Sequence, residues 1–204
     1  MNVEHGSVSP AENADILETP LGEKLMFEGA LIDVHHMTVR LPNGREALRE
    51  VVRHKGAAAV VPVDAQGMVT LVRQHRVVVG EVTLEIPAGK LDHIGEDPLA
   101  CAARELEEET GLTAATLTPL CPMITTPGFC TERVHLYLAT GLTQRKAHLD
   151  ADEFLHVVRM PLAQAVARVM RGELSDGKTA LGLLMAWGML GMGALPQGGH
   201  VSLE

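Results

Sequence analysis

The sequence predicts an α/β protein, in which a layered domain with a mixed β-sheet follows a small N-terminal antiparallel sheet. One strongly marked helix lies near the middle of the 204-residue chain, between series of short strand-like segments. Two further segments near the C-terminus have the apolar period and length of helices. Interleaved strands and helices of this kind favour helices layered on a mixed sheet.

The N-terminal quarter predicts a loose leader and a small sheet. Residues 1–20 contain few large apolar groups, which is typical of a leader without its own core. Residues 23–40 suggest two strands around Glu28-Gly29, and Leu41-Pro42-Asn43-Gly44 has the composition of a hairpin turn before a returning strand at 46–54. Three strands of this size make a poor independent core, so we expect the sheet of residues 21–55 to lean on another structure.

Residues 56–195 are expected to form the main domain, with a tail at 196–204. Residues 57–63 are a nearly continuous apolar run, which is typical of a strand covered on both faces. Further strands are expected at 68–74, 83–86, 117–124, 134–139 and 154–160, and helices after Asp97, at 162–171 and at 179–192.

A segment near the C-terminus satisfies the spacing of a phosphate-binding P-loop, Gly172-Glu-Leu-Ser-Asp-Gly177-Lys178-Thr179. A P-loop needs a buried strand before it, whereas the preceding residues have helical periodicity. We therefore expect helix, turn and helix here, with Asp176 near the N-cap of the second helix.

Composition excludes some functions. A formal net charge of −9 argues against non-specific nucleic-acid binding, because phosphate backbones require a basic surface. A small phosphate-bearing substrate remains compatible, since a bound divalent metal would change the local field. The three cysteines show no ligand spacing and favour a reducing, cytoplasmic compartment. The apolar run 180–195 is too short for a comfortable membrane span, so no membrane partner is expected.

The central helix is defined by its ends and its apolar period. Asp97 is a good N-cap, Pro98 fits the first helical position, and Gly111 is a natural stop. Apolar residues at helical spacing predict the face that packs on the core: Leu99, Ala102, Ala103 and Leu106.

Glu105 and Glu109 would lie together on one edge of that face, with Glu108 close by and Glu107 towards solvent. Like charges one turn apart cost a few tenths of a kcal/mol, and the helix dipole disfavours anions near a C-terminus. Converging carboxylates are what a hard cation such as Mg²⁺ requires. The alternative is a solvated acidic face in which Arg104 pairs with Glu108.

The segment Arg104-Glu105-Leu106-Glu107-Glu108-Glu109-Thr110-Gly111-Leu112 resembles the second half of the Nudix box, and Glu96 stands eight positions before Arg104 as that pattern asks. Six residues separate Gly89 from Glu96, one more than the usual Nudix pattern has. The extra residue lies in the loop before the helix, so the helical carboxylates stay in register. The resemblance implies a Nudix-type α/β/α sandwich that binds two or more Mg²⁺ ions, or Mn²⁺ in their place. The implied ligands are Glu105, Glu109, the backbone carbonyl of Ala88 and Glu108, with Arg104 orienting the carboxylates.

Other segments resemble the ADP-ribose pyrophosphatase branch of that family: Leu71-Val-Arg-Gln-His-Arg76, Leu84-Glu-Ile-Pro-Ala-Gly89, Pro127-Gly-Phe-Cys-Thr-Glu132 and Tyr137-Leu-Ala-Thr. In that branch the position of Glu132 acts as general base or places the water, with Glu108 the next candidate here; an ordinary loop carboxylate is the alternative. Arg76 would clamp a substrate phosphate, or simply pair with Glu81 at the surface. Gly128 and Phe129 would contact substrate.

The resemblance also implies a homodimer that exchanges the N-terminal sheet. Phe27 would then stack on the adenine in the partner's active site, or serve only to anchor the sheet. The expected activity is Mg²⁺-dependent cleavage of ADP-ribose to AMP and ribose 5-phosphate. Another nucleoside-diphosphate sugar or a dinucleotide is the alternative substrate. A domain that senses ADP-ribose without cleaving it would be expected to lose the box carboxylates, and they are intact here.

Overall fold

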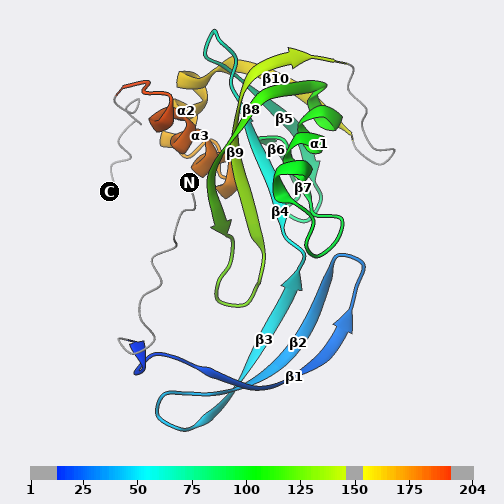
Figure 1. Ribbon diagram of the computed structural model, residues 1–204, viewed down its shortest axis with the longest axis vertical. Helices are drawn as coiled ribbons and strands as arrows, with labels where there is room; N and C mark the ends of the chain where they lie inside the picture. Colours follow the sequence, from blue (N-terminus) through cyan, green and yellow to red (C-terminus); the bar gives the residue numbers. More distant parts are fainter. Residues whose placement is uncertain (1–12, 146–153, 194–204) are drawn as a thin grey trace. The chain divides into compact units, whose positions relative to one another are not determined.

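The computed structural model describes residues 13–145 and 154–193, which divide into two compact units (Figure 1). The N-terminal unit runs up to His54 and includes Thr126–Thr131, and the core unit contains the rest of the described chain. The expected leader falls mostly outside the described residues, although strand β1 begins at Thr19, and the expected tail lies wholly outside them.

The N-terminal unit is an antiparallel sheet with strand order β1-β2-β3. Its strands are β1 (Thr19–Glu28), β2 (Ile32–Arg40) and β3 (Glu46–His54). The predicted hairpin between β2 and β3 is confirmed, with Gly44 at a positive φ of 83°. Residues 126–131 lie beside β3, because the Val52 N–H donates to the Phe129 carbonyl at 2.7 Å and the Thr131 N–H donates to the Val52 carbonyl at 2.9 Å.

The core unit contains two sheets and three helices. The four-stranded mixed sheet has the order β7-β4-β9-β8, with β4 and β9 parallel, and the three-stranded sheet has the order β10-β5-β6. The strands are β4 (Ala57–Pro62), β5 (Met68–Arg76), β6 (Glu81–Glu85), β7 (Ala88–Lys90), β8 (Leu112–Ile124), β9 (Arg133–Gln144) and β10 (Leu155–Pro161). The helices are α1 (Pro98–Thr110), α2 (Leu162–Met170) and α3 (Gly177–Met189).

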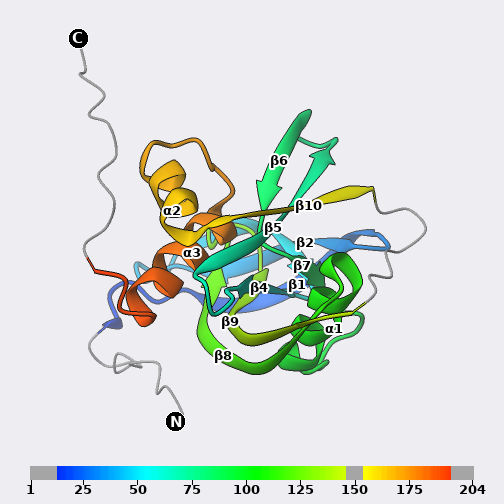
Figure 2. The same cartoon turned by 90° about the horizontal axis from the view of Figure 1, so that it is seen from above.

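Strand β4 is covered on both faces, as its apolar run predicts. Ala58 and Val60 pack in the cluster that contains α1, whereas Ala59 and Val61 pack in the cluster that contains α2 and α3. Alternate residues of a strand point to opposite faces, so one strand supplies both clusters. The helices accordingly lie on opposite sides of the β4–β9 pair (Figures 1 and 2), which confirms the α/β/α arrangement.

The segment with P-loop spacing lies between two helices and not after a strand. Helix α2 ends at Met170, and α3 begins at Gly177 with Asp176 as its N-cap, whose carboxylate accepts from the Thr179 N–H at 3.1 Å. The predicted helix–turn–helix is therefore confirmed, and the P-loop interpretation is excluded.

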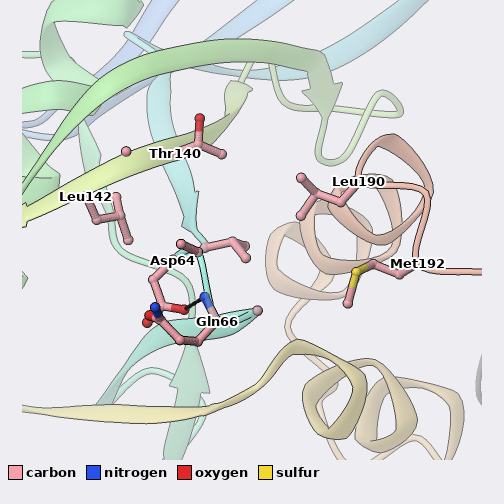
Figure 3. A pocket seen from close by; sticks show the side chains of 10 residues that line it. Asp64, Gln66, Thr140, Leu142, Leu190 and Met192 are labelled. Carbon is pink, nitrogen blue, oxygen red and sulfur yellow. Dashed lines mark hydrogen bonds between the residues drawn. The ribbon is translucent and has the colours of Figure 1, made fainter.

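A hollow of about 820 Å³ lies at the C-terminal end of β4 and is lined by residues that include Asp64, Gln66, Thr140, Leu142, Leu190 and Met192 (Figure 3). The Asp64 carboxylate accepts from the Gln66 and Met68 N–H groups at 2.9 Å and pairs with Arg159. Burial would raise the pKa of Asp64, but these bonds outweigh it and lower the pKa. Its charge thus stabilises the β4–β5 turn. Among the described residues, no helix is long and apolar enough to cross a membrane.

Candidate active site

Helix α1 begins and ends where its sequence predicts. Asp97 is the N-cap and its side chain accepts from the Leu99 N–H at 3.1 Å, while Pro98 occupies the first turn. Gly111 adopts a φ of 69°, the left-handed conformation that ends many helices, and its N–H donates to the Glu107 carbonyl at 2.8 Å. These caps fix the rotation of the helix and hence the direction of its carboxylates.

The buried face of α1 differs from the predicted apolar stripe. Leu99 is 40% exposed and Ala103 is exposed, so these two assignments were wrong. The buried residues are Cys101, Ala102, Glu105, Leu106, Glu109 and Thr110. Periodicity counts only apolar side chains, and here two carboxylates occupy positions in the buried face. Glu105 and Glu109 therefore lie within that face and not at its edge.

Gly89 and Glu105 are in direct contact. A Cβ placed on Gly89 would overlap both oxygens and the Cδ of the Glu105 carboxylate. Glu105 is 7% exposed, so its carboxylate is held at the loop and away from solvent. A larger residue at this position would require the Glu105 carboxylate to move, because the carboxylate fills the space of a side chain.

Glu109 is held by the preceding residue of the same loop. Its Oε2 accepts a hydrogen bond from the Ala88 N–H at 3.1 Å, and its side chain is 2% exposed. Residues 88 and 89 thus contact the two carboxylates that lie one helical turn apart on α1. Strand β7, which the sequence analysis missed, holds these residues by pairing with Ala57–Ala59 of β4.

Arg104 lies among four carboxylates. Its Nη1 is 2.7 Å from Glu105 Oε1 and 3.1 Å from Glu108 Oε2, and its Nη2 lies 3.7 Å from Glu96 and 3.8 Å from Asp92. Partial burial would lower the pKa of Arg104, but these charges raise it, so the guanidinium stays protonated. It offsets part of the negative charge that the loop and the helix bring together.

Glu85 is a buried carboxylate that the sequence analysis did not single out. It accepts from Arg76 Nε at 2.8 Å, from Arg76 Nη2 at 2.7 Å and from Thr83 Oγ1 at 2.6 Å, and it also pairs with Lys178. Burial would raise its pKa, yet the Arg76 bonds and the Lys178 charge lower it to about 2. The alternative to the phosphate clamp, a surface pairing of Arg76 with Glu81, was wrong, since Arg76 binds Glu85. The hairpin register does not reveal this pair, because β5 and β6 place Arg76 opposite Glu81 and Glu85 opposite Val72, and Arg76 reaches along the sheet face to Glu85.

The remaining predicted residues lie on other segments. Glu132 immediately precedes β9, and its backbone carbonyl accepts from the Thr125 N–H at 3.4 Å. Phe27, Gly128 and Phe129 belong to the N-terminal unit, and the two phenylalanine side chains are 57% and 54% exposed. The structure therefore brings Ala88, Arg104, Glu105, Glu108 and Glu109 together around the loop and α1.

Comparison with known proteins accounts for this arrangement. A family model described as the NUDIX domain matches residues 53–180. The chain belongs to the Nudix hydrolase family. It is therefore an enzyme of a family that uses divalent metal ions.

Named relatives agree with this assignment. The chain is 43% identical over 165 residues to an ADP-ribose pyrophosphatase of Bacillus subtilis, covering 80% of this chain and 89% of the relative. It is 40% identical over 168 residues to an ADP-ribose pyrophosphatase of Mycobacterium tuberculosis, covering 80% of each protein. A crystal structure described as an ADP compounds hydrolase superimposes with a TM-score of 0.68 at 27% identity, covering 86% of this chain and 96% of that one.

The donor set of this Nudix domain suits a hard divalent cation. Carboxylates and a backbone carbonyl are oxygen ligands, which Mg²⁺ prefers. Within residues 13–145 and 154–193, no three acidic, histidine or cysteine side chains already meet as one ligand group. Arg104 lies against Glu105 and Glu108, so a bound cation would share these carboxylates with the guanidinium, and a carbonyl and water would complete its shell.

Proposed function

We propose that this protein hydrolyses ADP-ribose to AMP and ribose 5-phosphate with Mg²⁺ as its cofactor. The observation that carries the proposal is the contact of Gly89 and Ala88 with Glu105 and Glu109, two buried carboxylates on one face of α1. The two relatives named as ADP-ribose pyrophosphatases support the choice of substrate.

In this proposal the cation is held by Glu105, Glu109, the Ala88 carbonyl and Glu108. When bound, two or more Mg²⁺ ions, or Mn²⁺ ions, would neutralise phosphoryl charge and acidify water. Arg104 would keep Glu105 and Glu108 aligned, because it donates to one oxygen of each. A water molecule attacks one phosphorus of the diphosphate and the bridging P–O bond breaks, with the bridging oxygen leaving on the other phosphate.

Two further residues would act on substrate and water. Glu132 takes the proton of the attacking water as general base, with Glu108 as the next candidate. Arg76 binds a substrate phosphate through Nη1, because Nε and Nη2 donate to Glu85. Glu85 holds the guanidinium plane in one orientation, which is how bidentate pairs provide geometric specificity.

We propose that residues 56–195 are the catalytic domain and that residues 21–55 are a sheet exchanged in a homodimer. Every residue of β1 is exposed, and a three-stranded sheet of this size has too small a core to be stable alone. In the dimer, Phe27 would stack on the adenine of the substrate bound in the partner's active site. Gly128 and Phe129 would also contact substrate. The three cysteines are all free thiols, which supports a cytoplasmic location.

A substrate screen tests the proposal. The enzyme is incubated with Mg²⁺ and a phosphatase, which releases inorganic phosphate from the monophosphate products but not from an intact diphosphate bridge. We expect ADP-ribose to give the highest kcat/KM among ADP-ribose, other nucleoside-diphosphate sugars and dinucleotides. A higher value for another compound would replace ADP-ribose as the substrate, and no release from any of them would refute catalysis. The Glu109→Gln variant is the control for contaminating hydrolases.

A further inference from the structure

Five consecutive residues before and in the loop are each fastened to the core unit, through contacts with β4, β5, α1 and α3. Glu85 binds Arg76 and Lys178, Ile86 donates to Thr179, Pro87 accepts from Val60, Ala88 donates to Glu109, and Gly89 lies against Glu105. The position of the loop is thus set by contacts on both sides of the sheet.

Thr179 is the link between α3 and this segment. Its side chain is completely buried, and its hydroxyl accepts from the Ile86 N–H at 2.9 Å. The same hydroxyl donates to Asp176 Oδ2 at 2.5 Å, so both of its hydrogen-bonding roles are used. A buried N–H group that loses its acceptor costs free energy of folding. The hydrogen bond therefore fixes the position of Ile86 relative to the first turn of α3.

The charges around Thr179 hold the same junction. Lys178 lies between Glu85 and Asp176, with Nζ 3.0 Å from Asp176 Oδ2 and a still closer contact to Glu85. Lys178 and Thr179, which belong to the segment with P-loop spacing, thus bind this protein's own carboxylates and backbone.

The constraint at Ile86 reaches the carboxylates through a stiff connection. Only Pro87 separates Ile86 from Ala88, and the proline ring fixes its own φ. Two residues of extended chain span about 7 Å, and the Val60 N–H holds the Pro87 carbonyl at 2.9 Å, so few backbone torsions can absorb a displacement at Ile86 before it reaches Ala88 and Gly89. Those two residues contact Glu109 and Glu105.

We propose that Thr179 is a positioning residue for the metal-binding carboxylates. Its hydroxyl sets the place of Ile86, and through Pro87 the places of Ala88 and Gly89 against Glu109 and Glu105. The inference rests on the proposed function in one respect, which is that these carboxylates hold the cation. It does not depend on which diphosphate is cleaved.

The test is Mn²⁺ binding by the full-length protein without substrate, measured by electron paramagnetic resonance. Thr179→Val keeps the shape of the side chain and removes the hydroxyl, whereas Thr179→Ser keeps the hydroxyl. Substituting a residue that orients a metal ligand without binding the metal itself weakens metal affinity about 10- to 100-fold. We expect Thr179→Val to bind Mn²⁺ about tenfold more weakly and Thr179→Ser to bind within about twofold of the native protein. Amide hydrogen exchange of the metal-free protein should quicken at Ile86 and Ala88 in Thr179→Val alone.

Val166→Ala controls for general loss of stability, because Val166 is buried in α2 and its apolar side chain forms no hydrogen bond to Ile86. It should lower the unfolding temperature and leave Mn²⁺ affinity unchanged. Native affinity in Thr179→Val, or an equal loss in Thr179→Ser or Val166→Ala, would overturn the proposal.

If Thr179→Val does not fold, Asp176→Asn replaces it, since the amide keeps an N-cap oxygen but accepts more weakly from the Thr179 hydroxyl. A severalfold loss of Mn²⁺ affinity is expected, and native affinity would overturn the proposal. If wild-type protein binds Mn²⁺ but releases no phosphate from any diphosphate, the proposed function fails while this inference stands.

Discussion

Gly89→Ala is the substitution that most directly probes the contact between the loop and α1. Gly89 does not have a left-handed backbone, so alanine is conformationally acceptable and only its methyl group is in conflict. That methyl would overlap the Glu105 carboxylate. The loop cannot retreat easily, because the Pro87 carbonyl accepts from the Val60 N–H at 2.9 Å and Ile86 is bound to Thr179. Glu105 must therefore swing away.

The expected loss has two parts. Overpacking a close contact costs about 1–3 kcal/mol, which for a protein of this size lowers the unfolding temperature by roughly 2–12 °C. Displacing a ligand should weaken Mn²⁺ binding at least about tenfold, since misplaced supporting residues alone have that effect. Thermal unfolding and Mn²⁺ titration of the same samples measure both.

Two further variants test whether the loss comes from the overlap with Glu105. Gly188→Ala is the matched control, because Gly188 is exposed in α3 and an added Cβ would meet nothing within 4 Å; it should gain up to about 1 kcal/mol. Adding Glu105→Ala to Gly89→Ala should restore stability, since the overlap disappears, but not metal binding. The reasoning is refuted if Gly89→Ala keeps native stability and native Mn²⁺ affinity.

Four other outcomes are expected. Glu109→Gln should largely abolish turnover and weaken Mg²⁺ binding while raising the unfolding temperature of the metal-free protein, because it removes a like charge one turn from another; full activity at ordinary Mg²⁺ would contradict this. Glu132→Gln should lower kcat about 10²- to 10⁴-fold with little change in KM, and an unchanged kcat would place the base elsewhere. Phe27→Ala should raise KM for ADP-ribose severalfold in a protein that gel filtration still shows as a dimer; loss of the dimer or an unaltered KM would leave Phe27 as packing. The folded-state pKa of Glu85, about 2, lies below its ordinary value of 4.5, so its ionised form stabilises the fold above about pH 4.5 and this stability is lost as the pH falls towards 2. Glu85→Gln should flatten that decline, which we put at about 2 kcal/mol after allowing for solvent screening, in urea unfolding measured from pH 3 to 7.

The sequence predicts the elements of the core unit because their signals are local. Caps define α1, and a continuous apolar run defines β4. Strand β7 was missed because it has only three residues, Ala88–Lys90, which follow a proline and include a glycine. So short a segment shows no alternating pattern. It exists because β4 offers a pairing edge, which is a tertiary property.

The site was predictable only in part, for the same reason. The sequence shows the order of the α1 carboxylates but not their burial. Leu99 and Ala103 were therefore assigned to the buried face in place of Glu105 and Glu109. The Arg76–Glu85 pair joins residues on neighbouring strands, and Lys178 reaches it from a helix more than ninety residues further along the chain. No local pattern encodes a contact across that separation.

Strand β1 has a consequence for how chains of this protein meet. It forms the outer side of its sheet, and its pairing with β2 shifts register between Pro20 and Gly22 and again between Leu25 and Phe27. Such bulges twist an edge and interrupt its row of hydrogen-bonding groups. An arbitrary extended peptide therefore cannot continue the sheet along β1 in simple register. Edge-to-edge pairing along β1 therefore requires a partner strand whose own register matches these two irregularities.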